Sequence, residues 1–178
     1  AAHFGLAELS EEFEEEVVEA SKSNLTIGQH YSGVAVKAVS LGLETILIHS
    51  ASQMFDNSQR WLPGGLFESL MAEYRSYLEK IEDHRLARIE CGARLAPEDL
   101  KAYLEDGYLV MVAGVISGEI LHSILLTGYN SDGYLVIDPI GGRKRQMGNR
   151  ELESFMDTKI GRWIMALRPN QGVTLTLK

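Results

Sequence analysis

The sequence predicts an α+β fold, with helices in the first part of the chain and a mostly antiparallel sheet in the last part. Two observations carry this prediction. Apolar residues recur mainly at helical spacing up to about residue 81, whereas apolar runs separated by turn residues dominate from residue 108 onward. Helices followed by strands, rather than strands alternating with helices, favour α+β over a doubly wound fold.

Helix signals mark four segments in the first two thirds of the chain. Ser10 precedes several acidic residues, which is typical of a helix N-terminus, and the acidic run that follows predicts a solvated helix face. Helices are also expected over Gly33–Leu41 and over Leu66–Ile81, the latter with one broad apolar face. Pro97 lies near the first position of the fourth helix, which runs over 96–105.

Strand signals dominate the last third of the chain. Tyr108–Val115 is nearly all apolar, which predicts a central strand buried on both faces. Asn130–Gly133 separates two further apolar runs and predicts a hairpin turn. The predicted strands are Leu43–Ile48, Leu86–Cys91, Tyr108–Val115, Ile120–Tyr129, Tyr134–Ile137 and Trp163–Leu167, with a loop over Ala51–Gly65 and a short helix over Asn149–Phe155.

Composition excludes several classes of protein. The chain has 178 residues, which is the size of one domain, and 17 Lys and Arg against 25 Asp and Glu give a net charge of −8. This balance argues against a nucleic-acid partner. No apolar run reaches the ~20 residues needed to span a bilayer, and no phosphate-loop motif or metal-ligand spacing occurs, so we expect no membrane insertion, cofactor or metal. A single cysteine excludes an intrachain disulfide and favours a cytoplasmic location.

His122 is the histidine that the sequence singles out. It interrupts an apolar strand, where a polar ring must find a partner. It is interpreted either as a core histidine bound to a backbone carbonyl or as a functional residue. The other histidines are in helix ends, loops or polar segments, where a surface role is expected; they are His3, His30, His49 and His84.

Asp138 is the candidate partner of His122, because it ends the following strand. It is either a simple turn-former before Pro139 or the carboxylate that orients the imidazole. The outcome depends on the hairpin register. A turn centred on Asn130 sets His122 and Asp138 opposite each other, whereas a turn centred on Asp132 separates them by four residues, roughly 13 Å along the strand.

Two other features bear on function. Cys91, the single thiol, lies beside no helix N-terminus and no cationic neighbour, so it is interpreted as a buried small hydrophobic residue rather than a nucleophile. The basic cluster Arg143–Arg145 follows two glycines. It is interpreted as an exposed loop, or alternatively as a carboxylate- or backbone-facing rim of a binding groove.

The segment from His122 to Pro139, HSILLTGYNSDGYLVIDP, resembles the His-to-Asp segment of the bacteriocin-processing cysteine peptidases. These are papain-like peptidases, fused to ABC exporters or standing alone, and in them this string carries the catalytic His and the Asp that orients it. The spacing of 16 residues and the TGY and DP elements all match. The GxxxxGxAxxAxxxG helix of stand-alone relatives resembles Gly28–Gly42.

The resemblance implies a papain-like fold over residues 1–178, with His122 and Asp138 as catalytic residues and a peptide or protein as substrate. It also implies association with an exporter or a larger parent protein. The first residues, AAHFGL, resemble the end of the family's first helix, so the helix that carries the nucleophilic Cys is expected to be missing from this chain. Three interpretations stay open: a truncated or processed peptidase, a degenerate peptide-binding module, or another group replacing the thiol. An unrelated structural domain is the remaining alternative.

Overall fold

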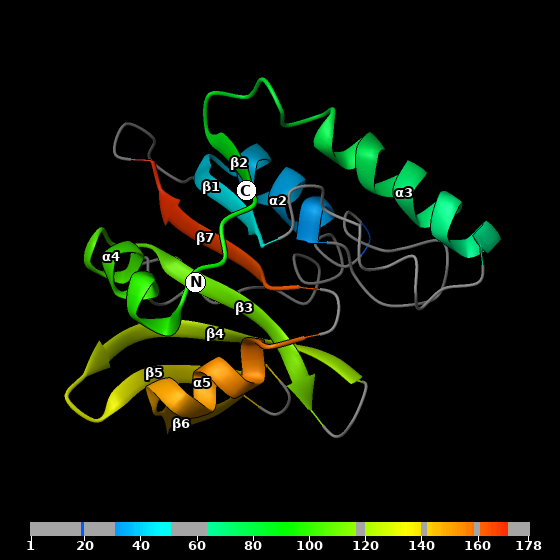
Figure 1. Cartoon of the computed structure of the whole chain (residues 1–178). Helices are drawn as coiled ribbons and strands as arrows, with labels where there is room; N and C mark the ends of the chain where they lie inside the picture. Colours follow the sequence, from blue (N-terminus) through cyan, green and yellow to red (C-terminus); the bar gives the residue numbers. More distant parts are fainter. Residues whose placement is uncertain are drawn as a thin grey trace. The chain divides into compact units, whose positions relative to one another are not determined.

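The structure, a computed structural model, describes residues 19, 31–50, 64–116, 120–139, 142–158 and 161–170. They belong to two compact units. Figure 1 shows the helices and strands of the chain with their labels. The first unit comprises residues 1–46, 62–89 and 168–178, and the second comprises residues 47–61 and 90–167.

The first unit contains two helices that pack on each other, α2 (Tyr31–Ser40) and α3 (Gly64–Leu78). Ala35 and Ala38 of α2 are buried, as is the large Tyr74 side chain of α3. The unit also contains the beginnings of β1 (Leu43–His49) and β2 (Ala87–Cys91) and the end of β7 (Trp163–Pro169).

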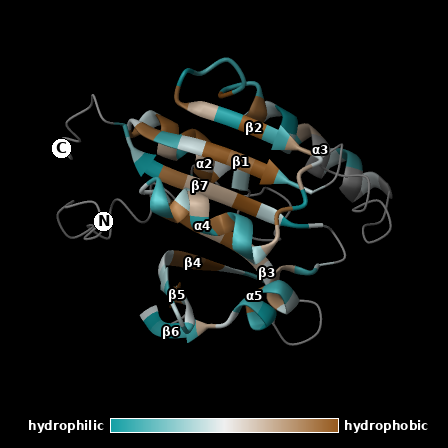
Figure 2. Ribbon diagram, turned by 60° about the vertical axis from the view of Figure 1, so that its left-hand side comes forward, coloured by the Kyte–Doolittle hydropathy of each residue, from teal (hydrophilic) through white to brown (hydrophobic). Residues whose placement is uncertain are grey.

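The second unit contains a meander of four strands with short helices on it. Hydrophobic residues dominate β4 and the part of β7 in this unit, as the brown colouring shows (Figure 2). Its elements, besides the ends of β1 and β2 and most of β7, are η3 (Pro97–Asp99), α4 (Leu100–Glu105), β3 (Leu109–Ile116), β4 (Ile120–Asn130), β5 (Gly133–Asp138), β6 (Arg143–Met147) and α5 (Asn149–Met156).

The strands are hydrogen-bonded in the order β2-β1-β7-β3-β4-β5-β6. The pairs β7–β3, β3–β4, β4–β5 and β5–β6 are all antiparallel. The described part of the chain therefore has a mixed α+β fold with four α-helices and a seven-stranded sheet, which confirms the predicted class.

One face of β3, β4 and β5 is covered by η3, α4 and α5 (Figure 1). Even-numbered side chains of β3 point to this face, and their partners in β4 do the same, because paired residues in adjacent strands share a face. The buried residues of this inner face are Val110, Val112, Ile124, Leu126, Tyr134 and Val136, with Leu100, Leu152 and Met156 from the helices.

Most predicted elements are present, with bounds that differ by at most three residues. Most of the predicted Ser10 helix and most of the predicted Ala51–Gly65 loop lie outside the described residues. The interpretation of Arg143–Arg145 as a loop was wrong, because these residues begin strand β6, which pairs with β5. In the described part of the chain, no helix is long and apolar enough to cross a membrane.

Candidate functional site

His122 and Asp138 are directly hydrogen-bonded. The Nε2 atom of His122 donates to Oδ1 of Asp138 at 2.8 Å, and the side chains are 9% and 22% exposed. Asp138 is therefore a partner of the imidazole and not merely a turn-former. Because a carboxylate accepts, the neutral ring carries its proton on Nε2 and leaves Nδ1 as the acceptor.

The β4–β5 hairpin reaches this geometry through a bulge. Ser131 and Asp132 form a two-residue turn, in which Asn130 Oδ1 accepts a hydrogen bond from the backbone N–H of Asp132 at 2.9 Å. The pairing then shifts by one residue at Thr127, whose hydroxyl donates to the carbonyl of Leu135 at 3.2 Å. The pairs are Gly128 with Leu135 before the shift, and Leu126 with Val136 and Leu125 with Ile137 after it.

The bulge decides which face Asp138 points to. In the shifted register Asp138 comes opposite Ile124, on the same face as His122 and two residues from it along β4. Without the extra residue, Asp138 would come opposite Leu125 and point to the other face, because a one-residue slip reverses every side chain. The observed register is neither of the two left open by the sequence, and it makes His122 and Asp138 diagonal neighbours.

Phe155 of α5 packs against His122. The two rings meet edge to face, with centroids 6.5 Å apart and planes at 86°. Gly114 pairs with His122 across β3 and β4, and its missing side chain leaves the space that Phe155 occupies. A β-carbon on Gly114 would overlap both the ring and the carbonyl oxygen of Phe155. The imidazole is thus held by a carboxylate on one side and an aromatic ring on another.

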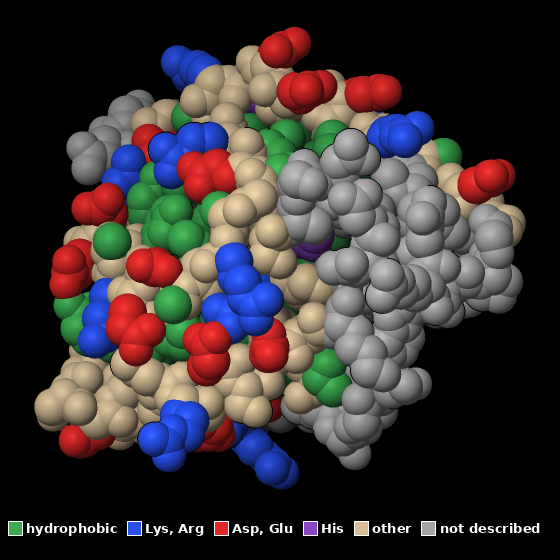
Figure 3. Space-filling model, in the orientation of Figure 1, with side chains coloured by type: hydrophobic (Ala, Val, Ile, Leu, Met, Phe, Trp, Pro, Cys, Tyr) green, Lys and Arg blue, Asp and Glu red, His purple; other side chains and the backbone are tan. Residues whose placement is uncertain are grey.

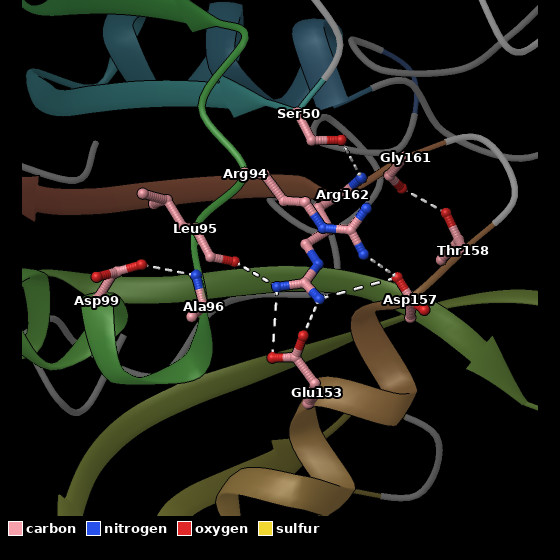
Figure 4. Close-up of polar contacts among 10 residues, drawn as sticks. All are labelled: Ser50, Arg94, Leu95, Ala96, Asp99, Glu153, Asp157, Thr158, Gly161 and Arg162. Atoms are coloured by element: carbon pink, nitrogen blue, oxygen red, sulfur yellow. Dashed lines mark hydrogen bonds and ion pairs between the residues drawn. The ribbon is translucent and has the colours of Figure 1, made fainter.

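Arg162 ties α5 to the loop before η3 (Figure 4). Its side chain is 3% exposed, and its guanidinium donates to the carbonyl of Leu95 at 2.6 Å and to both carboxylate oxygens of Glu153. A buried guanidinium needs such partners, because an unpaired buried charge is strongly destabilising. The backbone N–H of Arg162 also donates to Ser50 Oγ at 2.9 Å.

Cys91 does not join the pair. It ends β2, which is separated from β4 by β1, β7 and β3, and these four inter-strand steps correspond to roughly 19 Å. The residue is exposed, so its interpretation as a buried hydrophobic residue was wrong. Partial burial of the thiol raises the pKa of Cys91, which opposes formation of the thiolate.

Two other histidines, His49 and His84, are among the described residues. His49 is buried at the end of β1, with its ring centroid 4.3 Å from that of Trp163, so the surface role expected for it was wrong. His84 is exposed, and its Nδ1 accepts a hydrogen bond from the backbone of Leu86 at 3.2 Å. His3 and His30 lie outside the described residues. Among the described residues, no group of three or more His, Cys, Asp and Glu side chains forms a candidate metal centre.

Three residues of the site were not predicted from the sequence. Gly114 and Phe155 resemble ordinary strand and helix residues in the sequence, and Arg162 is a single cation before a strand. Only the glycine inside an apolar strand carried a signal, since such a glycine often marks a close approach by another part of the chain.

No protein-family model matches the sequence, and no curated protein matches it. The structure, however, is similar to that of a peptidase domain, so the chain has a peptidase-like α+β fold. The solved structure is the peptidase domain of Streptococcus ComA, described as a bi-functional ABC transporter involved in a quorum sensing pathway. The TM-score is 0.51 at 17% identity, over 96% of this chain and 85% of that chain.

Proposed function

We propose that residues 1–178 form a papain-like cysteine-peptidase domain that hydrolyses peptide or amide bonds, with His122 and Asp138 as two members of its catalytic triad. The 2.8 Å hydrogen bond between them carries the proposal. The spacing of 16 residues and the similarity to a transporter's peptidase domain add support. A peptide substrate and association with an exporter follow from the same proposal.

His122 would act as the general base and then as the general acid. Its Nδ1 takes the proton of a thiol, and the thiolate attacks the substrate carbonyl carbon. The tetrahedral intermediate collapses to a thioester as the imidazolium returns the proton to the leaving amine. Water, deprotonated by the same nitrogen, then hydrolyses the thioester to a carboxylic acid and regenerates the thiol. Asp138 keeps Nε2 protonated and stabilises the imidazolium.

The thiol in this scheme is not Cys91, given its position and its raised pKa. The family resemblance implies a nucleophilic Cys on the first helix of the family, and the 178 residues contain no thiol besides Cys91. The same observation favours a second candidate function, a non-catalytic module of the same fold that binds a peptide without cutting it.

The test compares the complete gene product with three of its variants against a library of quenched fluorescent peptides. We expect His122→Ala to lower hydrolysis by about 10²- to 10⁴-fold. His84→Ala, a change at an exposed histidine, and Cys91→Ser should leave it unchanged. Peptide binding without cleavage would select the second function, and neither binding nor cleavage would reject both.

A further inference from the structure

Among the described residues, strand β6 forms one edge of the sheet and pairs with β5 alone. It is last in the strand order, and its described neighbour is β5, with Arg143 opposite Asp138 and Met147 opposite Tyr134. Alternate residues of such a strand direct their N–H and C=O groups away from the sheet. Among the described residues, no other backbone hydrogen bond involves Arg143–Met147.

This edge is cationic in an acidic protein. Arg143, Lys144 and Arg145 are consecutive and exposed, whereas the whole chain carries a net charge of −8. Arg145 is bonded to Glu151 of α5 at 2.6 Å. Neither Arg143 nor Lys144 forms an ion pair within the described part of the chain. Two cations on this edge are therefore left for a partner.

The register directs the two cations to opposite faces of the sheet. Arg143 shares the face of Asp138, its partner in β5, whereas Lys144 shares the face of Ile137. A strand added beside β6 would place adjacent residues of its own on the same two faces. Two consecutive acidic residues in that strand would meet one cation each.

We propose that β6 is a docking edge for an extended, acidic peptide segment, which adds to the sheet as a further strand. The backbone of β6 supplies the pairing, and Arg143 and Lys144 select consecutive acidic residues. One end of the docked segment would lie beside Arg143, which pairs with Asp138 of the candidate site. Docking does not require His122 to be catalytic, so it goes beyond the proposed function.

A charged edge also has a simpler role, since Lys and Arg on edge strands keep sheets from associating. That role predicts that no peptide binds. The two roles therefore differ in a measurable way: selective binding of an acidic peptide is expected only if β6 is a docking edge.

The test uses fluorescence anisotropy with a short labelled peptide of Val and Thr that carries two central Glu residues. We expect the protein to bind this peptide and not its counterpart with two Lys residues. The double variant Arg143→Glu/Lys144→Glu should weaken binding by about tenfold or more. Arg150→Glu, which reverses another exposed cation on α5 outside β6, should not. Circular dichroism verifies that both variants fold.

N-methylation of alternate backbone amides in the peptide separates strand addition from simple charge attraction. It keeps both glutamates but blocks pairing with β6, so we expect binding to be lost. The proposal is overturned if the methylated peptide binds equally well, if Arg143→Glu/Lys144→Glu has no effect, or if anionic phosphatidylserine vesicles bind to this edge while the peptide does not.

Discussion

Gly114 of β3 lies directly against Phe155 of α5, whose ring and carbonyl oxygen occupy the space that a side chain at position 114 would need. A β-carbon at position 114 would overlap two ring carbons and the carbonyl oxygen of Phe155. The carbonyl belongs to the helix backbone and cannot rotate away. Because Phe155 also contacts the His122 ring, this glycine links helix packing to the candidate site.

We expect Gly114→Ala to destabilise the protein by about 1–3 kcal/mol, because the added methyl group forces α5 away from the sheet. The measurement is the midpoint of urea unfolding. Gly128→Ala in β4 is the matched control: its β-carbon would lie 3.5 Å from the Leu135 side chain, an ordinary contact, so a change within about 0.5 kcal/mol is expected. Equal effects at the two positions would contradict the packing argument.

Arg162 and Arg94 offer a comparison between a buried and an exposed arginine at the same helix end. Arg162→Met leaves the Leu95 carbonyl and Glu153 without their buried partner and should cost about 3–5 kcal/mol. Arg94 bonds to Asp157 at 2.6 Å, but its side chain is 64% exposed, so Arg94→Met should cost at most about 1 kcal/mol. The measurement is the free energy of unfolding of each variant. Similar losses of stability in the two variants would show that burial of the arginine does not matter.

Local sequence signals predicted the strands and helices well, since each depends on periodicity and turn residues within a short window. Apolar runs marked β3 and β4, and Pro97 marked the start of a helical segment. Strand β6 was missed because RKRQM has a single apolar residue, Met147, and no β-branched or aromatic residue of the kind that indicates a strand. Its pairing comes from the neighbouring strand rather than from its own side chains.

The candidate pair could be named from the sequence but its geometry could not. The spacing of His122 and Asp138 suggested a contact, yet the face of Asp138 depends on the one-residue bulge at Thr127. The position of a bulge depends both on the geometry of the turn and on which side chains are buried on the inner face. The pattern of apolar residues along the sequence therefore does not predict it. The roles of Gly114, Phe155 and Arg162 depend on contacts between distant segments.

Acidic and basic side chains are mixed over the face that carries α4 and α5 (Figure 3). Because no single sign of charge dominates this face, the pH dependence of stability in this region should come from individual buried groups. Tyr134 is the clearest case. Its side chain is buried, its hydroxyl donates to the carbonyl of Pro97, and burial together with Glu98 raises its pKa to about 12.

Stability should therefore fall at alkaline pH through Tyr134. Since the folded pKa is about 12 and the unfolded value is 10.0, the folded state holds the proton more tightly, and stability present below pH 10 is lost as pH rises toward 12. Tyr134→Phe should cost about 1 kcal/mol at neutral pH, because a hydrogen bond is lost. Urea unfolding at several pH values checks this. The difference in the free energy of unfolding between wild type and Tyr134→Phe should narrow above pH 10. A constant gap would be evidence against the effect.

Asp138 should control which nitrogen of His122 carries the proton. In the wild type we expect one neutral tautomer, with the proton on Nε2, because only that nitrogen donates to the carboxylate. Asp138→Ala removes the acceptor, so the ring should populate both tautomers, whereas Asp132→Ala in the exposed hairpin turn should leave the ring unchanged. Long-range ¹H–¹⁵N spectra distinguish the tautomers. A mixture in the wild type, or an unchanged ring in Asp138→Ala, would show that Asp138 does not orient His122, and the proposed triad would lose its second member.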